Sequence, residues 1–188
     1  IVDAEMNAFI RNIHVINTTD RPRTIKVFTY QAFAIGDSRS NTDTAQYLPD
    51  SNAILHYRGR RAFIVSGYTD DTPFDQFSIG LFGSDDHQGT FRDAEDGELS
   101  GNVVEHGRVD SALRFSVSVD AHSSKRVHYW IAAGMNNREA LYVHKQIQDN
   151  GVFDRIHATA NWWHTWLQPA IETAKKLPVE HQDRFIES

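Results

Sequence analysis

Residues 111–119 contain the pattern that most limits the fold, a strict alternation of apolar and polar side chains. The apolar positions are Leu113, Phe115, Val117 and Val119, and the positions between them hold Arg114, Ser116 and Ser118. Because successive side chains of a strand point to opposite faces, this pattern predicts a β-strand with one buried and one solvated face. Residues 126–133 alternate in the same way, and the short connection at 121–124 predicts that the two strands pair as a hairpin.

Strand-like segments of this kind recur from residue 7 to about residue 133. Turn formers at 17–22 end the first of them, and the arginine-rich tip at 58–61 predicts a hairpin between its two flanking segments. The predicted strands are 9–16, 24–35, 52–57, 62–68, 74–82, 111–119 and 126–133. Short strands at this spacing favour a mainly β domain over residues 1–134, built as an antiparallel sandwich or barrel.

After Gly134 the apolar period becomes helical, and residues 135–177 are interpreted as a helical linker. Asn136 or Asn137 can cap a helix that runs to about Asn150, and Gly151 suits its C-terminal end. A second helix is expected to start near Val152, and Pro169 is expected to end or kink it. Its apolar stripe consists of Phe153, Ile156, Ala160, Trp163 and Leu167.

Both ends of the chain are interpreted as truncation points. Ile1 and Val2 lead directly into a strand-like stretch, and a helix expected from Pro178 stops just after Phe185 and Ile186. About three turns are too few to bury two large apolar side chains without a partner. We therefore expect residues 178–188 to begin a helix of a further domain.

Composition excludes several classes of partner. The net charge is −6, with 25 acidic and 19 basic residues, so the basic excess typical of nucleic-acid binding is missing. No apolar run approaches the roughly 20 residues that span a bilayer, so no membrane partner is expected. The chain has no cysteine, which excludes disulfides and thiolate metal sites and fits a reducing compartment such as the cytoplasm.

The most unusual segment is the acidic, glycine-bounded stretch at 89–102, Gly-Thr-Phe-Arg-Asp-Ala-Glu-Asp-Gly-Glu-Leu-Ser-Gly-Asn, followed by Gly-Arg-Val-Asp-Ser at 107–111. It resembles the G-T-[WF]-R-D-A-E-D-G-x-L-S-x-N…G-x-V-D-S segment of bacterial and archaeal glycoside hydrolase family 15. That family contains the glucoamylase, glucodextranase and trehalase-like enzymes. Segments 47–57, 129–134 and 177–180 resemble the same family in the same order, so the resemblance is collinear over nearly the whole chain.

The resemblance implies a two-part enzyme. Its N-terminal super-β-sandwich, similar to galactose mutarotase, is joined by linker helices to an (α/α)6 barrel with two inverting catalytic glutamates. On this comparison residues 1–134 are a sandwich without its first strands, 135–177 are the linker, and 178–188 begin the barrel. The catalytic glutamates have no counterpart here, so no catalytic residue is assigned, and no cofactor or metal is expected. The expected partner is the C-terminal barrel domain of the parent protein, through which carbohydrate would be bound.

Five residues of the acidic loop are candidates for a contact between domains: Phe91, Arg92, Asp93, Glu95 and Asp96. Paired carboxylates could perform the acid–base chemistry of a glycosidase. The favoured interpretation is structural, with Asp93 or Asp96 accepting hydrogen bonds from local backbone N–H groups and Arg92 as an internal counterion.

Four residues are candidates for contact with a sugar. His56 and His128 lie in predicted strands and could line a concave site, although half-buried strand histidines are common. Trp163 and Trp166 could form a stacking platform, but packing of their helix against the sandwich or the barrel is favoured. No two helical histidines have the four-residue spacing of a zinc-binding helix, so no metal site is expected.

Three functions therefore stay open. The favoured one is a non-catalytic scaffold of an inverting α-glucoside hydrolase. The alternatives are a free-standing carbohydrate-binding module that uses the tryptophans, and a mutarotase-like epimerase that uses His56 or His128.

Overall fold

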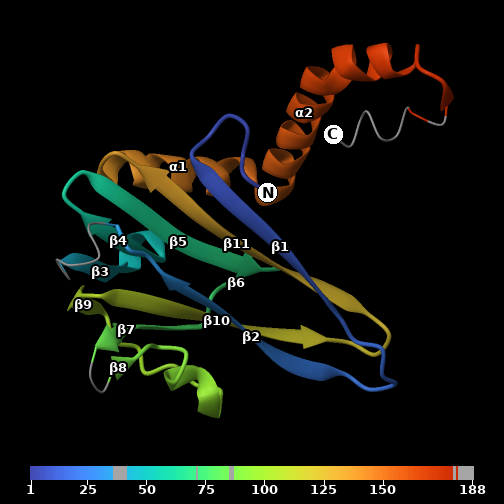
Figure 1. The fold of residues 1–188 in the computed structure, drawn as a ribbon. Helices are drawn as coiled ribbons and strands as arrows, with labels where there is room; N and C mark the ends of the chain where they lie inside the picture. The colour runs from blue at the N-terminus through green and yellow to red at the C-terminus, as the bar shows by residue number, and fades with distance from the viewer. Residues whose placement is uncertain (36–41, 71, 85–86, 180, 182–188) are drawn as a thin grey trace.

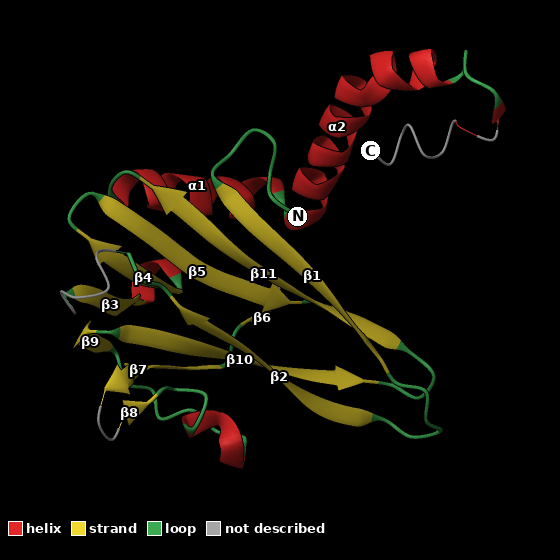
Figure 2. Ribbon diagram, viewed as in Figure 1, coloured by secondary structure: helices red, strands yellow, loops and turns green. Residues whose placement is uncertain are grey.

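The computed structural model describes residues 1–35, 42–70, 72–84, 87–179 and 181, and these form two antiparallel sheets and two α-helices (Figures 1 and 2). The larger sheet has the strand order β1-β11-β5-β4-β3-β9, with β6 added beside β5, and the smaller sheet has the order β2-β10-β7-β8. The strands are β1 (Ala8–Ile16), β2 (Arg23–Ala32), β3 (Asp43–Leu48), β4 (Ala53–Arg58), β5 (Arg61–Thr69), β6 (Thr72–Pro73), β7 (Gln76–Ser84), β8 (His87–Gln88), β9 (Val104–Gly107), β10 (Val109–Val119) and β11 (Ser124–Gly134). The mainly β, antiparallel sandwich expected from the sequence is confirmed.

Two apolar cores hold the layers together. The first lies between the sheets and includes the alternating Phe115, Val117 and Val119 of β10. The second lies on the opposite face of the larger sheet, where Trp130 and Ile10 pack against the first helix. Both faces of the larger sheet are thus covered.

The first helix, α1 (Asn137–Asn150), begins as expected, because the Asn136 side chain accepts a hydrogen bond of 2.9 Å from the Glu139 N–H. It ends at Gly151, whose φ of 84° lies in the left-handed region that favours glycine. Val143 and Ile147 bury its apolar face against the larger sheet. Both predicted helix boundaries are confirmed.

The second helix, α2 (Val152–Ala174), contains Pro169 and continues past it. Of the two predicted outcomes, an end at the proline is therefore wrong, and Figure 1 shows that the helix bends. Its first turns are held by the N-terminal segment, since Arg155 donates to both carboxylate oxygens of Asp3, at 2.8 and 2.6 Å. The Ala4 N–H also donates to the Thr159 hydroxyl at 3.3 Å.

The predicted pairing of 111–119 with 126–133 is wrong. β10 pairs with β2 and β7 in the smaller sheet, whereas β11 pairs with β1 and β5 in the larger sheet. The connection at 121–124 therefore crosses between layers. The hairpin around 58–61 is confirmed, because β4 and β5 pair directly, with Arg58 opposite Arg61.

The predicted solvated face of β10 exists only along part of the strand. Ser116 and Ser118 are exposed, but Asp110, Ala112 and Arg114 on the same face are buried. Alternation predicted one covered face, yet a loop that lies elsewhere in the sequence covers the first half of the other face as well.

Neither α1 nor α2 is long and apolar enough to cross a membrane, nor is any other helix in the part of the chain described above. The predicted helical segment with Phe185 and Ile186 lies outside the described residues.

Candidate functional site

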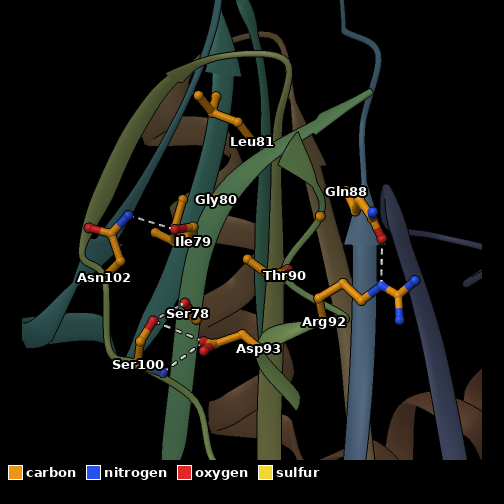
Figure 3. A pocket seen from close by; sticks show the side chains of 11 residues that line it. Ser78, Ile79, Gly80, Leu81, Gln88, Thr90, Arg92, Asp93, Ser100 and Asn102 are labelled. Atoms are coloured by element: carbon orange, nitrogen blue, oxygen red, sulfur yellow. Dashed lines mark hydrogen bonds between the residues drawn. The ribbon is translucent and has the colours of Figure 1, made fainter. Parts of the chain in front are cut away.

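The acidic loop lies over the outer face of the smaller sheet and borders a surface pocket of about 570 Å³ (Figure 3). Segments 88–93 and 100–102 form its two walls, and β7 forms its floor. Ile79 points into the core between the sheets, so the Ser78 side chain points into the pocket, and the backbone of Gly80 forms part of the floor.

Short hydrogen bonds within the loop hold its carboxylates. Asp93 accepts from both the backbone N–H and the hydroxyl of Ser100, at 2.7 and 2.9 Å, as Figure 3 shows. Asp96 accepts from the Glu98 N–H at 2.8 Å. Arg92 donates to Gln88 at 2.6 Å and pairs with Glu95. These contacts agree with the structural interpretation of the loop, whereas its role as a domain contact stays a prediction.

Phe91 is the apolar member of the predicted loop set. Its ring meets the ring of Tyr30 edge-on, with centroids 5.9 Å apart, and both side chains are 44% exposed. The Arg92 guanidinium lies 5.4 Å from the Phe91 ring centre. This loop therefore presents a small aromatic surface beside the pocket.

A charged network that the sequence did not indicate fixes the far end of the loop. The buried Arg114 pairs with Asp75 and donates to Glu98 at 2.6 Å, and Lys26 reaches Glu98 at 2.6 Å. Hydrogen bonds from Lys26, Gln76 and Arg114 lower the pKa of Glu98 to about 2. Burial acts to raise the pKa of Asp75, but hydrogen bonds from Arg114 and other groups outweigh it and the pKa is lowered.

This arrangement does not favour acid catalysis by Glu98. A glycosidase needs a carboxylic acid whose pKa is raised so that it can protonate the leaving group. The pKa of Glu98 is shifted in the opposite direction. Its hydrogen bonds stabilise the ionised form instead.

Two polar groups lie buried beneath the pocket. The Asp110 carboxylate accepts from the Thr90 N–H at 2.9 Å and is hydrogen-bonded to the Tyr30 hydroxyl. Its other oxygen and the Thr90 hydroxyl have no hydrogen-bond partner among the described residues. Thr90 and Asp110 both belong to the two segments that carry the family resemblance, but the sequence interpretation assigned neither of them to a site.

His56 lies in the interior, where a sugar has no access to it. Its side chain is fully buried between the sheets, and Nε2 lies 2.8 Å from the Ser111 hydroxyl. Ser111 also accepts from Gln31 at 3.0 Å, and Gln31 accepts from the Tyr129 hydroxyl at 3.2 Å. Burial lowers the pKa of His56 to about 3, so the ring is neutral.

His128 lies on the other face of the larger sheet, away from His56. It is 5% exposed and contacts the rings of Tyr68 and Phe153, with centroids 4.8 and 5.0 Å away. The same residues border a second pocket of about 460 Å³ together with Lys125 and Arg126. The structure therefore does not bring the two candidate histidines into one site.

The tryptophans form an exposed cluster on α2. Trp163 is 46% and Trp166 62% exposed. The predicted packing of these two side chains against the sandwich is therefore wrong, and packing against a barrel stays a prediction. The rings of Trp162 and Trp166 are nearly parallel, at 5°, with centroids 6.4 Å apart. Together with Glu5 they border a third pocket, of about 480 Å³.

Across the described residues, no group of three or more His, Asp or Glu side chains could hold a metal ion.

Comparison with known proteins shows similarity at the level of the fold. No protein-family model matches the chain, and no curated protein matches its sequence. A bacterial glucoamylase, solved in complex with acarbose, superposes with a TM-score of 0.63 at 10% sequence identity. The superposition covers 89% of this chain but only 24% of the glucoamylase chain. The chain thus has the fold of about a quarter of a bacterial glucoamylase.

Proposed function

We propose that this chain is the non-catalytic sandwich and linker of an inverting α-glucoside hydrolase of family 15, and that it supports a separate (α/α)6 barrel. The collinear resemblance in sequence and the likeness in fold to a glucoamylase support this assignment. In the proposed division residues 1–134 are the sandwich, 135–177 the linker and 178–188 the entry to the barrel.

The observation that most favours a scaffold is the exposed aromatic face of α2. A cluster of three tryptophans open to water is costly for a monomeric domain, and such patches usually mark an interaction site. A barrel domain lying against α2 would remove this surface from water. The Asp3–Arg155 pair would hold the base of the helix in a fixed direction for that contact.

The proposed absence of catalysis can be tested on the isolated chain. We expect no hydrolysis of maltose, isomaltose or trehalose above the buffer rate, because the loop carboxylates are held as acceptors of structural hydrogen bonds. Hydrolysis that disappears in Glu95→Gln or Asp96→Asn, but persists in the control Glu172→Gln on α2, would contradict the proposal.

The proposed barrel contact can be tested by fluorescence. Iodide should quench Trp162, Trp163 and Trp166 in the isolated chain, while the buried Trp130 serves as an internal reference. The parent protein should protect the three exposed rings. Equal quenching of these rings in both proteins would exclude a contact through α2.

A carbohydrate-binding module is the second candidate, because the parallel rings of Trp162 and Trp166 border a pocket that also contains Asn161 and Glu5. Saccharides often stack on such rings while amides and carboxylates bind their hydroxyl groups. This function predicts calorimetric binding of malto-oligosaccharides that is lost in Trp166→Ala without loss of folding. Binding that Trp166→Ala leaves unchanged would exclude α2 as the site.

A further inference from the structure

The edge strands of the two sheets differ in how they are protected against pairing with another strand. Within the described residues, β1 and β9 end the larger sheet, and β2 and β8 end the smaller one. An edge strand exposes main-chain N–H and C=O groups, so such strands are usually short, bulged, covered or charged. β9 has only four residues, and β8 has two and pairs with β7 in a shifted register. Neither of them offers a regular edge to another strand.

The longer edge strand β1 is protected in a different way. The N-terminal residues lie along its start, where Val2 forms an antiparallel bridge with Phe9. Farther along, Arg11 lies on the inward face between Phe9 and Ile13, and its side chain is exposed. An inward-pointing charge on an edge strand opposes pairing with another strand.

β2 lacks these protections. It has ten residues without glycine or proline, and its register with β10 is continuous from Arg23 to Ala32. No described strand pairs with its other side. Since the main-chain groups of an antiparallel strand point alternately to its two sides, half of those in β2 point to this open side. The charge at its centre, Lys26, is already paired with Glu98, at 2.6 Å.

The sequence of β2 is complementary to itself when two copies run antiparallel about Val27. In this register Thr24 lies opposite Tyr30 and Lys26 lies opposite Phe28, and the two-fold symmetry makes each pair occur twice. An aromatic ring opposite a β-branched side chain stabilises paired strands, and the methylene chain of a lysine can cover a neighbouring ring. The outer face of β2 therefore suits a second copy of itself.

The inner face of β2 leads to the same partner. In this register Val27 lies opposite its own copy and Ile25 lies opposite Thr29. Ile25 and Val27 are only partly buried at the side of the core between the sheets, so a second copy would remove more of their apolar surface from water. Arg23 would lie opposite Gln31, so the register places no two like charges opposite each other.

We propose that β2 binds a second copy of this chain by antiparallel, two-fold pairing, which joins the two four-stranded sheets into one continuous sheet. The contact is separate from the tryptophans of α2. It does not depend on the proposed scaffold function, and a monomeric chain would leave that proposal as it stands.

Sedimentation equilibrium over a range of micromolar concentrations tests the proposal, and the chain should show a monomer–dimer equilibrium. Phe28→Lys places two lysine pairs opposite each other, so the dissociation constant of the dimer should rise about tenfold. Phe28→Glu instead places a carboxylate opposite Lys26 of the second copy and should keep the dimer. Circular dichroism establishes that both variants are folded. Equal weakening by the two substitutions would overturn the proposed register.

Val104→Lys is the matched control, because Val104 is 49% exposed on the short edge strand β9. It should leave the dissociation constant unchanged. Amide hydrogen exchange of the wild-type chain provides a test without substitution, since a higher protein concentration should slow exchange in β2 but not in β9. A wild-type chain that stays monomeric, with exchange in β2 independent of concentration, would overturn the proposal. A dimer that is lost in Trp166→Ser but kept in Phe28→Lys would place the contact on α2 and overturn it equally.

Discussion

The helices α1 and α2 follow each other directly, and both have an apolar stripe at helical spacing, but α2 buries its apolar side only in its first turns. Ile147 is fully buried against the larger sheet, while Phe153, Trp163 and Trp166 of α2 are exposed. Within the described residues, α2 is attached only at its first turns, where Val152 and Ile156 join the same core and Arg155 pairs with Asp3. An amphipathic pattern therefore predicts that a helix has an apolar face, but the rest of the protein decides what covers that face.

The largest effect on stability is expected where α1 packs against the larger sheet. Ile147→Ala should lower the free energy of unfolding by about 3 kcal/mol, because it leaves a cavity against the sheet. Urea unfolding monitored by circular dichroism measures this loss. The control is Tyr142→Ala, at a position on the same helix that is 64% exposed. Equal losses in the two variants would show that α1 is not packed as described.

Acid should lower the free energy of unfolding through the histidines buried in the interior. Burial lowers the pKa of His56 to about 3, and burial also lowers the pKa of His144 on α1. The unfolded chain therefore takes up protons first, and stability is lost as the pH falls below about 6.5 and until it reaches about 3. For His56 alone the loss at pH 5 should be about 2 kcal/mol.

Measurement between pH 7.5 and pH 5 separates this effect from the carboxylates. The pKa values of Asp3, Asp75 and Glu98 are lowered, so the stability they contribute is lost only at more acidic pH. Urea midpoints that stay constant between pH 7.5 and pH 5 would contradict a neutral, buried His56.

Removing the N-terminal cap of α1 should have a smaller effect on the free energy of unfolding. α1 has a side-chain cap at Asn136, whereas α2 begins at Gly151 without one. Asn136→Ala should destabilise the protein by about 1 kcal/mol. Asn136→Ser should restore most of that loss in urea unfolding, because serine can accept the same hydrogen bond. Failure of serine to recover stability would mean that the cap hydrogen bond is not the cause.

The smallest effect on stability is expected on the tryptophan face. Trp166→Ser should change the free energy of unfolding by no more than about 0.5 kcal/mol, since the ring is 62% exposed. It should instead reduce concentration-dependent association in light scattering, because it removes apolar surface. Tyr142→Ser on α1 is the matched surface control. If both variants associate like the wild type, the α2 face is not an adhesive surface.

Sequence alone determined the local elements of this protein. Alternation at 111–119 identified a strand, arginines at 58–61 a hairpin tip, and Asn136 with Gly151 the two ends of α1. Each of these depends on neighbouring residues, through backbone geometry or a single cap, so a short stretch contains the information. Asp93 and Asp96 as acceptors of nearby N–H groups belong to the same class.

Only the tertiary structure decided which surfaces meet. The consecutive strands β10 and β11 were expected to pair but belong to different sheets. The prediction failed because alternation shows that a strand has a buried face but does not show which strand lies beside it. Arg114 is buried by Asp75, 39 residues away, and the Trp166 face stays open because no described segment covers it. The unpaired groups of Thr90 and Asp110 lie 20 residues apart in the sequence and meet only in the folded protein. Contacts over such separations follow from how the layers pack, which no local pattern records.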